Sequence, residues 1–69
     1  MALTAEERVR AAEEAVRQLK AGLAGAGVTL PSLRVDPLSV AGEGLPLVEL
    51  GRCNLDTALR LAAVLEEEQ

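Results

Sequence analysis

The stretch Pro31-Ser32-Leu33-Arg34-Val35-Asp36-Pro37 decides the fold, because it interrupts the helical patterns on either side of it. Its two terminal prolines lack the amide hydrogen that helix interiors and central strands require. Between them, the apolar Leu33 and Val35 alternate with charged residues, as in a strand with one apolar face. The stretch therefore predicts a short strand over residues 32–36.

A second strand is predicted downstream, in Leu45-Pro46-Leu47-Val48-Glu49-Leu50-Gly51. A loop precedes it, with Gly42-Glu43-Gly44 as its turn signal. Two short strands joined by a modest loop pair most simply in antiparallel fashion. Arg34 would then face Glu49 on the outer side of a two-stranded ribbon.

A long helix is predicted before the ribbon, near residues 5–24. Thr4 followed by Glu7 is a capping box, in which each side chain binds a free amide of the first helical turn. Gly25 or Gly27 is expected to take the left-handed conformation that ends the helix. The apolar positions recur every three or four residues and form one narrow stripe. They are Ala5, Val9, Ala12, Val16, Leu19 and Leu23.

A second helix is predicted after the ribbon, from Leu55 to about Glu67, with Asn54 as its N-cap. Its apolar residues span about 200° of the helical wheel at 100° per residue. These residues are Leu55, Ala58, Leu59, Leu61, Ala62, Ala63 and Leu65. The predicted fold is therefore α+β in the order α-β-β-α, one domain over residues 1–69. Both helices would pack on one face of the antiparallel ribbon, which dimerisation could extend.

The composition narrows the range of functions. The 69 residues contain no histidine, no aromatic residue and one cysteine, and the net charge is −4. Histidine is the usual proton carrier and metal ligand, and a basic patch is usual in nucleic-acid binders. We therefore expect no catalytic residue, no metal, no cofactor and no nucleic acid. No apolar run reaches the ~18 residues of a membrane span, so we expect no membrane partner.

The small size of the chain favours self-association. A chain of this length rarely gains more than ~3–5 kcal/mol from its core, and small proteins add disulfides, metals or subunits. A single cysteine cannot form an intramolecular disulfide, which leaves association. We expect an interface at Leu61, Val64 and Leu65 of the second helix and at Arg34 and Glu49 of the ribbon. The alternative is that one monomer covers the whole apolar arc by itself.

The sharpest local motif is Gly51-Arg52-Cys53-Asn54, where the second strand leads into the second helix. A helix N-terminus with Arg52 beside it could activate the Cys53 thiol or bind a small anion. The alternative is structural: Gly51 allows the turn, Asn54 caps the helix, and Cys53 is a small buried residue.

These observations predict a non-enzymatic protein, which self-associates or binds another protein. The alternatives are a redox-sensing regulator that acts through Cys53 and an acidic, antitoxin-like inhibitor. We do not expect an enzyme, because the sequence offers no nucleophile–base pair and so short a chain has little room for a pocket of ~300 Å³.

The lone thiol and the absence of a signal-peptide pattern in residues 1–8 predict a cytoplasmic location. The stretch over residues 30–37 and the later Leu50-Gly51-Arg52-Cys53-Asn54 resemble short αββα proteins of high-GC actinobacteria. This resemblance implies a compact stand-alone protein. It brings no activity and no functional residue with it.

Overall fold

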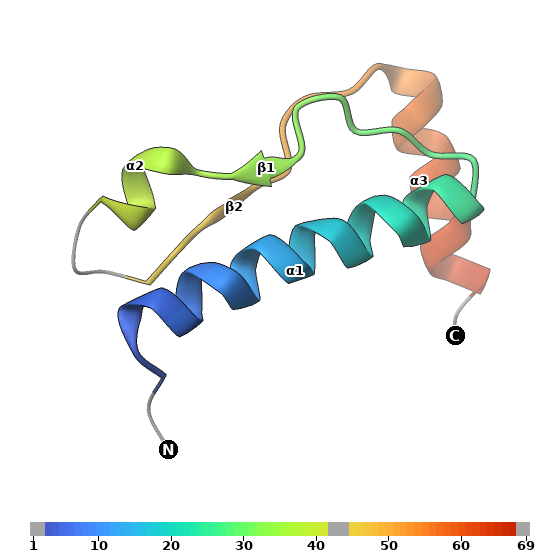
Figure 1. Cartoon of the computed structure of the whole chain (residues 1–69). Coiled ribbons are helices and arrows are strands. Elements are labelled where there is room, and N and C mark those ends of the chain that lie inside the picture. Colours follow the sequence, from blue (N-terminus) through green and yellow to red (C-terminus); the bar gives the residue numbers. More distant parts are fainter. Residues whose placement is uncertain (1–2, 42–44, 68–69) are drawn as a thin grey trace.

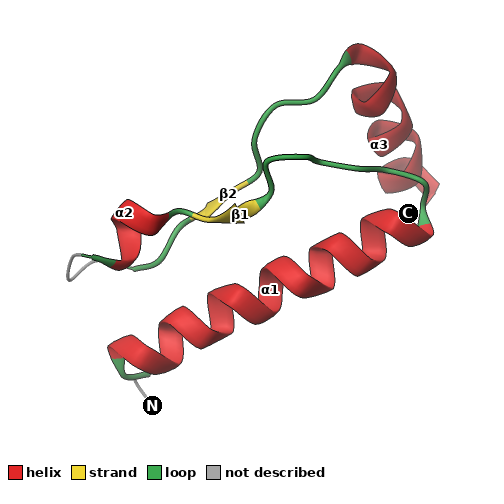
Figure 2. Cartoon of the chain, turned by 45° about the horizontal axis from the view of Figure 1, so that its top comes forward, coloured by secondary structure: helices red, strands yellow, loops and turns green. Residues whose placement is uncertain are grey.

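The computed structural model describes residues 3–41 and 45–67 of the chain. Its elements are α1 (Ala5–Gly25), β1 (Arg34–Val35), α2 (Pro37–Val40), β2 (Val48–Glu49) and α3 (Leu55–Glu67). β1 and β2 pair in a two-stranded antiparallel sheet, which confirms the α+β class (Figure 1). α1 packs against β1, whereas α3 stands to one side of both (Figure 2).

α1 begins and ends where the sequence predicts. The Thr4 amide donates to Glu7 Oε1 at 2.9 Å, and the Glu7 amide donates to Thr4 Oγ1 at 3.1 Å, which completes the capping box. At the other end, Gly27 has a φ of 74°, the left-handed conformation in which glycine is favoured. Of the two glycines considered for this role, Gly27 takes it, and Gly25 is the last residue of the helix.

Acid is expected to weaken α1. The hydrogen bond from the Thr4 backbone lowers the pKa of Glu7 below its ordinary 4.5, and the Arg17 hydrogen bond lowers the pKa of Glu14. A lowered pKa in the folded state stabilises the fold above pH 4.5, and this stability is lost as the pH falls through the folded-state value. The urea midpoint should be lower at pH 3 than at pH 7. This difference between the two midpoints should be smaller in a Glu7→Gln/Glu14→Gln variant. Equal pH dependence of both proteins would contradict the assignment.

The ribbon has the predicted register and shorter strands. Arg34 lies opposite Glu49, and Val35 lies opposite Val48. We expected strands over residues 32–36 and 45–51, but each observed strand has two residues. The Asp36 amide still donates to the Leu47 carbonyl across the ribbon at 2.8 Å. The first strand ends there because the Asp36 side chain caps α2, where its Oδ1 accepts from the Leu38 amide at 3.0 Å.

α2 occupies a segment where we expected only a loop. Pro37 stands in its first turn, where a missing amide hydrogen costs nothing. Ser39 Oγ donates to the Asp36 carbonyl at 2.7 Å and accepts from the Leu47 amide at 2.9 Å, which ties α2 to the chain leading into β2. The turn predicted at residues 42–44 lies outside the described residues.

The core is small. Among the described residues, three apolar side chains are buried: Val16 of α1, and Val28 and Leu33 of the segment between α1 and β1. α3 contributes no buried residue. α1 lies against β1, and the expected packing of both helices on one face of the ribbon is not confirmed.

Gly51 is fixed by its surroundings. Its φ is 79°, and a Cβ placed on it would lie 2.6 Å from the Ser32 Cβ. Gly51→Ala should therefore lower the free energy of unfolding by at least ~1–2 kcal/mol, the usual cost of a left-handed residue with a side chain. Gly22→Ala is the control, because α1 leaves open space there, and it should stabilise by about 0.5–1 kcal/mol. Urea unfolding measures both, and a neutral Gly51→Ala would refute the close approach.

Candidate interaction surface

α3 is attached to the rest of the molecule along one side. Thr57, Leu61 and Val64 are half-buried, and their spacing of four and three residues puts them on one face of the helix. Beside them, Arg60 Nη1 donates to the Gly27 carbonyl at 3.0 Å, at the end of α1. This contact joins α3 to the α1 C-terminus rather than to the ribbon.

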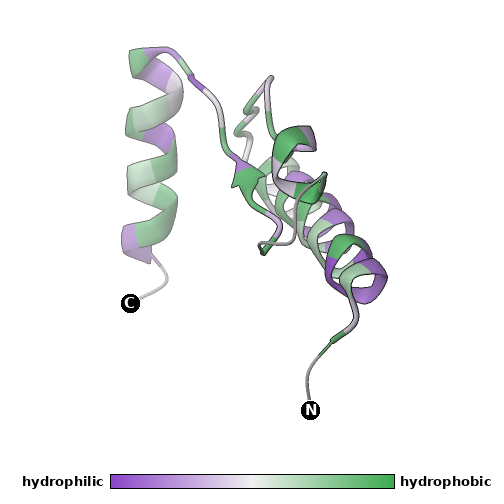
Figure 3. Ribbon diagram, turned by 90° about the vertical axis from the view of Figure 1, so that its left-hand side faces the viewer, coloured by the Kyte–Doolittle hydropathy of each residue, from purple (hydrophilic) through white to green (hydrophobic). Residues whose placement is uncertain are grey.

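The apolar centre of α3 faces solvent. Leu55, Leu59 and Leu65 are 71%, 60% and 59% exposed. Ala58 and Ala62 lie between them and are also exposed. We call these five residues the α3 face. Figure 3 shows α3 apart from the layers formed by α1 and the ribbon, with hydrophobic positions along its length.

The predicted interface residues of α3 fall on two sides of the helix. Leu65 belongs to the α3 face, whereas Leu61 and Val64 lie on the half-buried side. Leu55 and Leu59 were part of the predicted arc but were not singled out. Leu55 lies near the middle of that arc and Leu59 lies farther from the half-buried side. The sequence did not reveal that α3 turns the edge of the arc, rather than its centre, toward the molecule.

Arg34 and Glu49 form the predicted cross-strand pair. Arg34 Nε lies 3.2 Å from Glu49 Oε2, and the two side chains are 60% and 44% exposed. Pairs this exposed contribute at most about 1 kcal/mol, because water and salt screen them. The pair matches the register of the ribbon and leaves a polar outer surface there.

The segment leading into α3 is exposed throughout residues 51–54. Asn54 caps the helix as predicted, because its Oδ1 accepts from the Thr57 amide at 2.8 Å. The structure places Cys53 at the surface, so the expectation of a buried thiol is wrong. Arg52 is exposed beside it and forms no ion pair with any residue in the described ranges.

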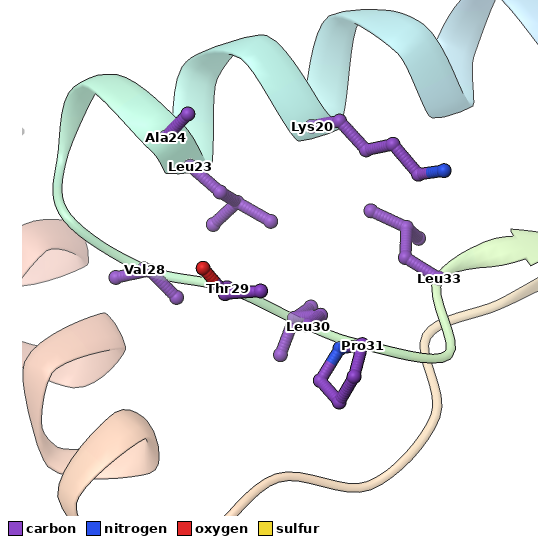
Figure 4. A pocket seen from close by; sticks show the side chains of 8 residues that line it. All are labelled: Lys20, Leu23, Ala24, Val28, Thr29, Leu30, Pro31 and Leu33. Atoms are coloured by element: carbon purple, nitrogen blue, oxygen red, sulfur yellow. The ribbon is translucent and has the colours of Figure 1, made fainter.

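An apolar hollow of about 320 Å³ lies between the end of α1 and residues 28–33 (Figure 4). A second, of about 350 Å³, lies between the start of α1 and Val40. Both reach the ~300 Å³ for which so short a chain was expected to have little room. Among the described residues, Lys20 and Thr29 are the polar side chains that line the first hollow, and no described carboxylate or thiol lines it. It therefore contains an amine without a partner for acid–base chemistry.

Within residues 3–41 and 45–67, no three His, Cys, Asp or Glu side chains gather closely enough to hold a metal ion. In the same part of the chain, no helix has the length and apolarity needed to cross a membrane.

Comparison with known proteins does not assign a family to the chain. No protein-family model matches it, and neither does any curated protein or any solved structure. The resemblance to short actinobacterial proteins rests on the quoted residues alone. A proposal about function therefore rests on the exposed residues of the chain itself.

Proposed function

We propose that this protein is a non-enzymatic interaction module that self-associates through the α3 face. The observation that carries the proposal is the exposure of Leu55, Leu59 and Leu65 on one side of one helix. Scattered single leucines are normal on protein surfaces, but a continuous apolar stripe marks an interaction site. The exposed Arg34–Glu49 pair offers a second, polar surface on the ribbon for a protein partner.

Burial of the exposed leucines of the α3 face supplies a driving force for association. Full burial of one leucine side chain is worth about 1.5–3 kcal/mol. Covering three leucines that are each more than half exposed therefore yields an energy on the scale of the ~3–5 kcal/mol expected from a core of this size. The part of the chain that the structure describes has three buried apolar residues, so apolar burial within it is small.

Sedimentation equilibrium over a range from micromolar to millimolar concentration tests the proposal. We expect the average mass to rise above the 7.2 kDa of one chain as the concentration rises. A mass that stays at 7.2 kDa throughout would contradict self-association through the α3 face.

One observation favours a second candidate, a redox-sensing regulator: the Cys53 thiol is exposed next to the α3 N-terminus. We propose a cytoplasmic location, where a single exposed thiol stays reduced until an oxidant reaches it. The test is the rate of alkylation of Cys53 at neutral pH. A rate well above that of free cysteine supports the candidate, and an equal rate removes it.

A further inference from the structure

We infer that the α3 face is covered by a second copy of this chain. The two α3 helices pack antiparallel about a two-fold axis that crosses them at the level of residue 60, on the side of the helix opposite the Arg60 side chain. The inference rests on the proposed function and adds the orientation of the two copies and the residues in contact. Three independent features of the chain lead to it: its surplus surface, the order of residues along α3, and the distribution of charge at the two ends of the helix.

The monomer has more surface than a protein of its mass normally exposes. Its accessible surface is 5437 Å², and its mass is 7.2 kDa. Monomeric proteins of that mass expose about 4,100 Å². The radius of gyration is 13.9 Å, whereas a compact chain of this length has about 11 Å. A stable dimer buries about 800 Å² per partner. The surplus is large enough to supply such an interface.

Four of the five residues of the α3 face form a pattern that is the same in both directions along the helix. Leu55, Ala58, Ala62 and Leu65 are separated by three, four and three residues, symmetric about Arg60. They share a sector of about 80° at 100° per residue. In a two-fold interface, residue i of one copy meets residue j of the other, and j meets i. An antiparallel pair centred on Arg60 therefore places Leu55 against the partner's Leu65 and Ala58 against the partner's Ala62.

The sizes of these residues and the directions of the neighbouring side chains suit this arrangement. The two alanines lie next to the axis, where small side chains let helices approach closely, and the leucines lie farther out. Leu59 is also exposed and flanks the sector on its open side. Arg60 points away from the sector, toward the Gly27 carbonyl that it binds. The contact that holds α3 in the monomer is therefore left intact by the pairing.

Charge selects the antiparallel direction. Glu66 and Glu67 lie in the last turn of α3, where the helix dipole already disfavours negative charge. Arg52 lies just before the N-terminus of the same helix and has no ion pair in the described structure. Asp56 in the first turn offsets the Arg52 charge, so the N-terminal end carries no net side-chain charge and only the partial positive charge of the helix dipole. An antiparallel pair keeps the two acidic ends apart and brings each to the N-terminal end of the partner's helix. A parallel pair would place the acidic ends together and the arginines together.

Disulfide trapping distinguishes the two directions, using Cys53 as a natural reporter. In the antiparallel pair the two Cys53 Cα atoms lie roughly 20 Å apart along the axis, from the 1.5 Å rise per residue. A disulfide needs Cα atoms within about 7 Å. Position 66 of one copy then lies beside Cys53 of the other. We would mix the wild-type chain with a Cys53→Ser/Glu66→Cys chain under oxidised glutathione, with each chain alone as control.

The expected result is a covalent heterodimer in the mixture and less than a tenth as much covalent dimer from either chain alone. A Cys53–Cys53 dimer from the wild-type chain would overturn the antiparallel arrangement and leave self-association standing. A dimer by sedimentation without any crosslink would also overturn it, because residues 53 and 66 would not be neighbours. A strict monomer by sedimentation would refute the proposed function itself.

Discussion

Leu55→Glu is expected to raise the dissociation constant of the homodimer by at least tenfold. Leu55 is 71% exposed in the monomer and lies in the first turn of α3, where a negative charge suits the helix dipole. The substitution therefore leaves the monomer fold intact. In the dimer, the substitution removes two buried leucines, one from each copy. It also places each new carboxylate beside the partner's Glu66. A loss of about 1.4 kcal/mol is already tenfold, and burial of one leucine is worth more than that.

Leu38→Glu is the matched control for this experiment. Leu38 is 83% exposed in α2, at the opposite end of the molecule from α3 (Figure 1). The same change in charge and apolar area should leave the dissociation constant within about twofold, because a surface position outside the interface contributes little. Sedimentation equilibrium measures both variants. Equal effects of the two substitutions would place the interface elsewhere.

Leu33→Ala is expected to unfold most of the protein. Leu33 is 3% exposed and is one of the three buried apolar residues in the described structure. Truncation of a buried leucine to alanine costs about 2–5 kcal/mol, which matches the ~3–5 kcal/mol available to a core of this size. Circular dichroism at 25 °C should show the loss of most of the α1 and α3 signal.

Leu45→Ala is the control for Leu33→Ala, since Leu45 is 70% exposed. It removes the same atoms from the surface and should change the free energy of unfolding by less than about 0.5 kcal/mol. If Leu33→Ala folded as well as Leu45→Ala, the core would not lie where the structure places it.

Local interactions made part of the fold predictable. The capping box of Thr4 and Glu7, the cap by Asn54 and the left-handed Gly27 each involve residues within a few positions of one another. The pairing of Arg34 with Glu49 followed from the charge alternation of the two strands. α2 was missed because Asp36 fits both a strand and a helix cap. The choice depended on the distant contact between Ser39 and Leu47.

The candidate surface was predictable in kind but not in position. The wide apolar arc of α3 indicated more apolar surface than so small a body covers. Which part of the arc stays open depends on the bond from Arg60 to the Gly27 carbonyl, a contact 33 residues apart in the sequence. The residue pattern does not show which side chain will bind a backbone carbonyl, so the sequence predicts Leu61 and Val64 at the interface, whereas the structure exposes Leu55 and Leu59.

Self-association through the α3 face can be tested directly by nuclear magnetic resonance. Backbone amide chemical shifts are followed while the protein is diluted from millimolar to micromolar concentration. If two copies meet through the α3 face, the amides around Leu55, Ala58, Ala62 and Leu65 should shift together along one binding curve. The amides of β1 and β2 should stay in place. Shifts that do not depend on concentration anywhere in α3, or that move only in the ribbon, would contradict the account.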